Sequence, residues 1–189
     1  MARALTRDPA AQASRMPLAS ALLACALLAG PGGPMAAAAG GRDDVRAGSV
    51  PPCQGSGLVA DGAQRLGATR IRITVVNEGP QPCALQGHPT LALAGQGSPH
   101  RNRPLAVHRE GVARPVQLAV GGVAEALVSF TPVLGEADGY CASRDAEPFV
   151  APSMVVGIAG GRFQLALDDG GNFALCGGSV HATAFRPAS

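Results

Sequence analysis

Glycine and proline interrupt this chain too often for helices of ordinary length to form. The 189 residues include 26 glycines and 16 prolines, with five Phe, one Tyr and no Trp. Both Gly and Pro destabilise the interior of a helix, and from Cys53 onward no window keeps an apolar helical period over several turns between them. The sequence therefore predicts short strands separated by turns.

Residues 69–77 (TRIRITVVN) give the clearest strand, because Ile71, Ile73 and Val75 fall on one face and polar residues on the other. We read Gly121-Gly122 and residues 168–172 as hairpin turns, and residues 99–104 as an exposed loop. Further strands are predicted at residues 58–61, 84–86, 90–94, 105–108, 116–119, 124–130, 154–158, 163–167 and 180–185. This spacing is typical of an all-β, immunoglobulin-like β-sandwich, which we place at residues 53–186.

Residues 1–39 have the features of a signal peptide. Arginines precede an apolar core at residues 18–28 (LASALLACALL), and alanines at 36–39 offer small-residue cleavage sites. The core is shorter than the roughly 20 residues that a membrane-spanning helix needs. We expect cleavage between Ala37 and Gly41, followed by a flexible linker over residues 40–52.

Cys25 lies inside that apolar core and permits an alternative. Residues 22–25 (LLAC) loosely match the cleavage box of lipoproteins, in which the cysteine is lipidated and stays as a membrane anchor. The apolar core, however, continues beyond Cys25, and the alanines that follow are a better site for ordinary cleavage. Lipidation of Cys25 is therefore kept as the second interpretation.

Four cysteines remain beyond the signal peptide: Cys53, Cys83, Cys141 and Cys176. An even number in an exported domain of this size predicts two disulfides. The sequence permits three pairings. We favour Cys53–Cys83 and Cys141–Cys176, because Cys53 precedes the first predicted strand and Cys83 follows the turn that ends the clearest one. No CxxC occurs, so neither a zinc ribbon nor a thioredoxin-like site is expected.

Charge and motif patterns predict no nucleic-acid partner, metal, cofactor or catalytic residue. Removing three Arg and one Asp with the signal peptide leaves 15 − 3 = 12 Arg against 13 − 1 = 12 acidic residues, a neutral domain. The four histidines (His88, His100, His108 and His181) lack the close spacing of ligands that are arranged in advance on one element, so we interpret them as surface or turn residues. No G-x-S-x-G nucleophile motif is present.

Residues 75–89 (VVNEGPQPCALQGHP) resemble a motif of the bacterial exported family called domain of unknown function 4232. That motif is a strand followed by N-x-G-x-x-x-C-x-L-x-G-[aromatic]-P, and His88 replaces its aromatic residue. Cys53, the segment 116–124 (VQLAVGGVA) and the pair Cys141 and Cys176 are also similar. The resemblance implies an extracytoplasmic β-sandwich, often tethered to the envelope, without a known activity.

These observations lead to one functional expectation and one alternative. We expect an exported cell-envelope protein, periplasmic or extracellular, that acts as a non-catalytic binding or structural module for an envelope or extracellular partner. It would touch the membrane only through a lipid on Cys25. The alternative is a secreted hydrolase whose site is assembled from residues far apart in the sequence.

Asn77 and Gly79 are expected at positive-φ positions of a turn.

Overall fold

A computed structural model describes residues 49–135 and 139–188 of the chain. The predicted signal peptide, including Cys25, lies outside these residues. The described part is all-β with two disulfides, as the sequence predicts. Its one helical element is a short 3-10 turn, η1 (Gly55–Gly57). No helix among the described residues is long and apolar enough to cross a membrane.

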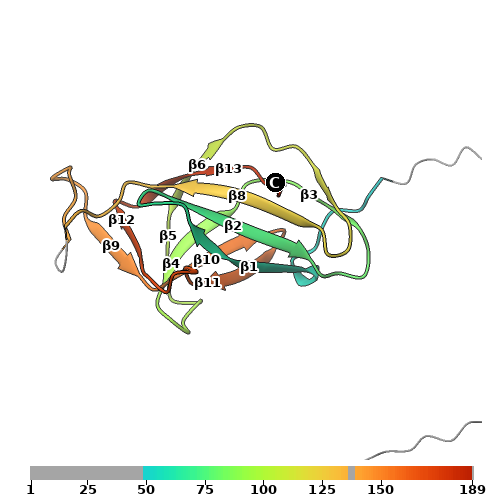
Figure 1. Ribbon diagram of the computed structural model, residues 1–189, viewed down its shortest axis with the longest axis horizontal. Coiled ribbons are helices and arrows are strands. Elements are labelled where there is room, and N and C mark those ends of the chain that lie inside the picture. The colour runs from blue at the N-terminus through green and yellow to red at the C-terminus, as the bar shows by residue number, and fades with distance from the viewer. Residues whose placement is uncertain (1–48, 136–138, 189) are drawn as a thin grey trace, which may run out of the picture. The chain divides into compact units, whose positions relative to one another are not determined.

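Two sheets form most of the domain, and Figure 1 shows the strands of the larger one side by side in front of the other layer. The larger, six-stranded sheet has the order β1 (Leu58–Arg65), β2 (Arg70–Asn77), β8 (Val123–Ser129), β13 (Ser179–Thr183) and β6 (Ala106–Glu110), with β14 (Arg186–Pro187) also paired to β8. The four-stranded sheet has the order β11 (Gly161–Leu165), β10 (Ser153–Ile158), β4 (Thr90–Ala94) and β5 (Asn102–Pro104).

Two short strand pairs complete the described fold. They are β3 (Cys83–Leu85) with β7 (Val116–Leu118), and β9 (Pro148–Ala151) with β12 (Phe173–Cys176). The pairings within the named sheets are antiparallel except that of β6 with β13, which is parallel. That exception places His108 directly opposite His181.

One apolar core lies between the two main sheets. Alternation in β2 buries Ile71, Ile73 and Val75 completely, as expected, while the residues between them are partly exposed. The strands β8, β4 and β10 add Ala124, Ala126, Val128, Leu91, Leu93, Met154 and Val156 to the same cluster. Most of the core side chains are Leu, Val, Ile and Ala, and Phe130, Phe173 and Phe185 are its buried aromatic residues.

Several sequence-based predictions about connections are wrong. Gly121-Gly122 does form a tight turn, with the Gly122 N–H donating to the Ala119 carbonyl at 2.8 Å. However, β7 pairs with β3 whereas β8 pairs with β2, so the turn crosses between sheets instead of closing a hairpin. Residues 168–172 likewise join β11 and β12, which belong to different sheets. A tight turn reverses the chain locally but does not decide which strand lies alongside.

Three strand predictions also need correction. The first strand continues to Arg65, because a bulge between Ala60 and Gly62 lets pairing with β2 resume. The expected loop at 99–104 contains the edge strand β5, where Pro104 is tolerated because an edge position does not need every N–H. The strand β9 was not predicted, since Pro148 and the polar residues before it gave no alternating pattern.

Candidate functional site

A groove opens between the end of β6 and the C-terminal segment. The two strands run parallel as far as Glu110 and Thr183, and then Gly111, with a φ of 73°, turns the chain away from β13. The space between the diverging segments measures about 560 Å³. This falls within the range of roughly 300–1,000 Å³ that small-ligand sites occupy.

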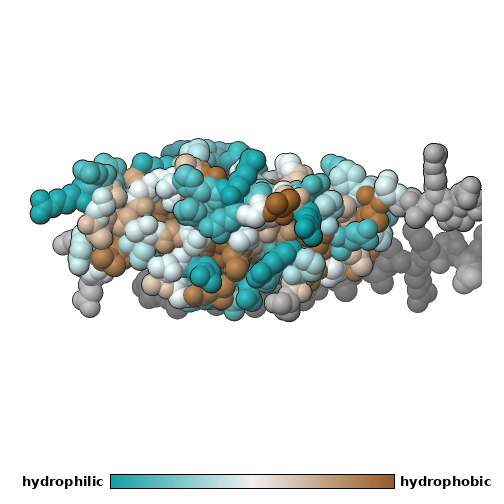
Figure 2. Space-filling view, turned by 90° about the horizontal axis from the view of Figure 1, so that it is seen from above, coloured by the Kyte–Doolittle hydropathy of each residue, from teal (hydrophilic) through white to brown (hydrophobic). Residues whose placement is uncertain are grey.

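The lining of the groove is mostly apolar, with charged residues among its members. The apolar part consists of Val112, Pro115, Val116, Ala184, Phe185 and Pro187. Val116 and Phe185 are buried and belong to the core, so they form a fixed floor, whereas Val112 is 82% exposed. Glu110, Arg114 and Arg186 supply the charges. Figure 2, taken from the side on which β6 lies in Figure 1, shows small hydrophobic areas among hydrophilic ones.

Arg186 is held in place by a buried carboxylate. Glu125 is only 2% exposed; its Oε1 accepts a hydrogen bond from Arg186 Nε at 3.0 Å and lies 2.7 Å from Arg186 Nη2. Arg72 Nε lies 3.2 Å from Glu125 Oε2 on the other side. Two guanidinium groups therefore share this one carboxylate, and the contacts tie β2, β8 and β14 together. The sequence did not single out Glu125, because its partners lie 53 and 61 residues away (125 − 72 and 186 − 125).

Three of the four histidines gather at the end of β6 beside the groove. The rings of His108 and His181 stack with their centroids 5.0 Å apart. The Glu110 carboxylate reaches His181, with 3.3 Å between Oε1 and Nδ1. His88 Nε2 lies 3.1 Å from the Glu110 carbonyl oxygen, so the residue that replaces the aromatic of the family motif binds the β6 backbone. His100 stands apart, in the loop before β5.

Arg114 differs from the other two charged residues of the lining. Glu110 contacts His181, and Arg186 is paired with Glu125. Among the described residues, Arg114 makes no ion pair. It is exposed at the rim of the groove. The groove therefore presents an apolar floor with Arg114 at its rim, a guanidinium that makes no ion pair among the described residues.

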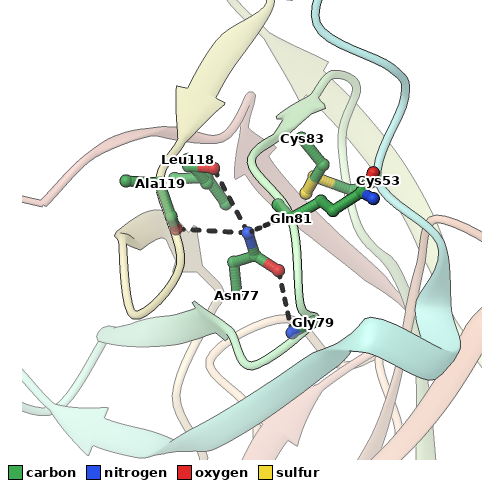
Figure 3. The surroundings of a disulfide bond; sticks show 7 residues. All are labelled: Cys53, Asn77, Gly79, Gln81, Cys83, Leu118 and Ala119. Atoms are coloured by element: carbon green, nitrogen blue, oxygen red, sulfur yellow. Dashed lines mark hydrogen bonds between the residues drawn. A yellow bond between two sulfur atoms is a disulfide. The ribbon is translucent and has the colours of Figure 1, made fainter. Parts of the chain in front are cut away.

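Asn77, a polar residue of the 75–89 segment, has a structural role. Asn77 is 1% exposed, and its Nδ2 donates to the carbonyls of Gln81 at 3.0 Å, Leu118 at 3.2 Å and Ala119 at 3.1 Å, as Figure 3 shows. Its Oδ1 accepts from the Gly79 N–H at 3.0 Å. The expected positive φ at Asn77 and Gly79 is wrong: neither is among the positive-φ residues of the described chain. Asn77 instead joins two turns through its buried amide.

The disulfides close opposite regions of the fold. Cys53 pairs with Cys83 across a Cα separation of 4.8 Å, next to the Asn77 amide (Figure 3). Cys141 pairs with Cys176 across 5.7 Å, where the segment after β8 meets β12. These are the two pairs that the spacing of the cysteines favours. Both pairs stabilise the fold, and neither lines the groove.

The acidic turn at 168–172 uses its carboxylates internally. Asp169 Oδ2 lies 2.6 Å from Arg65 Nε, and its Oδ1 accepts from the Gly171 N–H at 2.9 Å. The hydrogen bond from Arg65, with a smaller contribution from the Gly171 N–H, holds the pKa of the Asp169 carboxyl below its ordinary value. More widely, no group of three His, Cys, Asp or Glu residues in the described ranges is arranged to hold a metal ion.

These features define a class of protein, a disulfide-bonded all-β domain with an open groove at one sheet edge. A family model described as domain of unknown function (DUF4232) matches residues 53–186. The chain belongs to this family, which confirms the resemblance carried by the 75–89 segment. No curated protein and no solved structure shows significant similarity to the chain.

Proposed function

We propose that this protein is an exported, non-catalytic binding module, and that the groove binds an apolar molecule ending in a carboxylate. The observation that carries the proposal is the combination of a fixed apolar floor, formed by Val116 and Phe185, with the Arg114 guanidinium, which makes no ion pair among the described residues. Ligand sites are mostly apolar and use a few placed polar groups to orient the ligand. An arginine fork suits a carboxylate in both charge and geometry.

Two disulfides support export, because such bonds persist in oxidising compartments and are rare in a reducing cytosol. We place the domain in the periplasm or outside the cell, released from the signal peptide of residues 1–39. Lipidation of Cys25 is the alternative and would anchor the same domain to the membrane. Two facing sheets around one core also support an immunoglobulin-like arrangement, although the parallel β6–β13 pair departs from an all-antiparallel sandwich.

The binding proposal is tested by titrating octanoate into the isotopically labelled secreted protein while recording amide chemical shifts. We expect saturable shifts at residues 110–117 and 183–187. Val112→Asp should weaken binding at least tenfold, about 1.4 kcal/mol, because it replaces an apolar side chain of the lining with an anion that repels the ligand's carboxylate. Val120→Asp is the matched control: Val120 is also exposed but lies outside the groove, and its variant should bind like the unmodified protein.

A second variant and a second ligand test whether the groove prefers a carboxylate. Arg114→Gln should weaken binding of octanoate severalfold and leave binding of neutral octanamide unchanged, since only the anion uses the guanidinium. Absence of shifts in the groove, or an equal loss with Val120→Asp, would overturn the proposal. If Arg114→Gln affected the binding of both ligands equally, the groove would have no preference for a carboxylate.

One contact favours the alternative of a secreted hydrolase. The Glu110 carboxylate at 3.3 Å from His181 Nδ1 is the arrangement in which a carboxylate orients a general base. A hydrolase would turn over an activated acyl ester in a way that His181→Ala abolishes. The binding module predicts that the unmodified protein and His181→Ala hydrolyse p-nitrophenyl acetate at the same background rate.

A further inference from the structure

The pair His108–His181 has a geometry that the binding proposal does not use. The two residues are exact partners in the parallel register of β6 and β13, and their side chains lie on the same face of the six-stranded sheet. Their neighbours Ala182 and Val107 point to the opposite face, where Ala182 is fully buried and Val107 packs against the core. The backbone under the two imidazoles is therefore held by the sheet and the core.

The rings themselves are accessible from solvent. The side chain of His181 is 56% exposed, and His108 is an exposed residue of the edge strand β6. The two rings stack at 5.0 Å with an angle of 30° between their planes. Because they are exposed, they can turn about their side-chain bonds without disturbing the core.

The separation of the rings suits two ligands of one metal ion. A metal–nitrogen bond to imidazole is about 2.0–2.1 Å long, so two imidazoles bound at a near-tetrahedral angle have centroids roughly 5 Å apart. The stacked rings already have this spacing. What they lack is orientation: each ring must rotate so that its lone pair points to the common position between them.

Glu110 supplies the third feature of such a site. Its Oε1 lies 3.3 Å from His181 Nδ1, and a carboxylate this close favours the tautomer with its N–H at Nδ1, which leaves the Nε2 lone pair available. Metal-binding histidines commonly donate their second ring N–H to a carboxylate or carbonyl, which fixes the tautomer and raises ligand basicity. Glu110 thus acts as a positioning residue, consistent with the absence of a three-ligand group among the described residues.

We propose that His108 and His181 together bind one Cu²⁺ or Zn²⁺ ion, with Glu110 positioning His181 and water completing the coordination. Imidazole nitrogen suits both ions, and the general affinity order places Cu²⁺ above Zn²⁺ at a site of this kind. The site lies next to the groove but does not depend on what the groove holds. The two proposals are tested separately: the histidine pair can bind a metal ion when the groove binds no ligand, and the groove can bind a ligand when the pair binds no metal ion.

Titration of the secreted protein with Cu²⁺, followed by calorimetry and by electron paramagnetic resonance, tests this inference. We expect one tight equivalent whose spectrum shows two nitrogen ligands, and Zn²⁺ competing for it at higher concentration. His108→Ala and His181→Ala should each weaken that equivalent at least tenfold and reduce the nitrogen count by one. Glu110→Gln should weaken it about tenfold and keep both nitrogens, as positioning carboxylates do.

His100→Ala is the matched control, because His100 is an exposed histidine in a loop away from the pair. It should leave the affinity unchanged. All of the substituted side chains are exposed, and unchanged thermal unfolding without metal verifies that each variant folds. The inference is overturned if the double variant His108→Ala/His181→Ala binds Cu²⁺ as tightly as the unmodified protein, or if His100→Ala lowers the affinity as much as His181→Ala does.

Discussion

Replacing Asn77 with aspartate should lower the free energy of unfolding by about 4 kcal/mol. The Asn77 amide donates to three carbonyls at 3.0–3.2 Å while 1% exposed. Aspartate has the same shape but no N–H to donate, and it would bring an anion against those carbonyl oxygens. The Ala119 carbonyl keeps the Gly122 N–H as a donor, but a buried acceptor left without a donor costs about 1–3 kcal/mol, and burial of an unpaired charge adds to this. Chemical denaturation of the two proteins measures the difference.

Asn172→Asp provides the control for that substitution. Asn172 is exposed in the turn before β12, and only its backbone carbonyl is used, as an acceptor for Arg65 Nη2 at 3.0 Å. The same chemical change there should alter the free energy of unfolding by less than about 0.5 kcal/mol, as is usual at surface positions. If Asn77→Asp were equally mild, the buried amide would not be what joins the two turns.

Removal of the Cys53–Cys83 bond is the second large effect. The double variant Cys53→Ala/Cys83→Ala should lose roughly 3–4 kcal/mol, the value that the chain-entropy model assigns to a loop of about 30 residues. The sequence separation is 30 residues, and both cysteines are buried. Paired denaturation curves in non-reducing buffer measure the loss. Treatment with reductant should then destabilise the double variant less than the unmodified protein, because one of its two bonds is already absent.

A loss below about 1 kcal/mol in the double variant would contradict this expectation. It would mean that the corner around Asn77 is already ordered in the unfolded ensemble, or that the backbone bonds between Pro51 and Ala84 suffice to hold it. The Ala84 N–H donates to the Pro51 carbonyl at 2.8 Å, and the Cys53 N–H donates to the Ala84 carbonyl at 3.0 Å. The disulfide thus reinforces an existing pairing, and its contribution is additional to those bonds.

The parts of the fold that were predictable depend on local signals. Alternation at residues 69–77 identifies β2 and its buried face, because side chains on a strand point alternately to its two faces. The frequent Gly and Pro residues exclude long helices. The cysteine count and spacing favour the two disulfides. The family resemblance at residues 75–89 relies on turn chemistry and one cysteine, both of which are local in sequence.

The predictions that failed concern contacts between residues far apart in the sequence. Asn77 reads locally as a turn residue, but its side chain donates to Leu118, 41 residues away. Gly121-Gly122 reads as a hairpin turn, yet the strands on either side join different sheets. Neither the turn chemistry nor the apolar pattern records which strand will lie beside which, since pairing is decided by burial across the whole core.

The candidate site was not predictable for the same reason. Its groove joins residues 110–117 with residues 183–187, and each segment taken alone has an unremarkable composition. The sequence led us to interpret His108 and His181 as separate surface residues because 73 positions divide them (181 − 108). Only the parallel pairing of β6 with β13 brings them together, and parallel strands leave no hairpin signal.

We propose that this chain is an exported domain closed by two disulfides, each between cysteines that are neighbours in the order of the sequence. Peptide mapping under non-reducing conditions, on protein recovered from the cell envelope, tests it most directly. We predict one linked peptide joining Cys53 to Cys83, another joining Cys141 to Cys176, and a mature N-terminus between Ala37 and Gly41. A linked peptide joining Cys53 to Cys176, or free thiols at all four positions, would contradict the account.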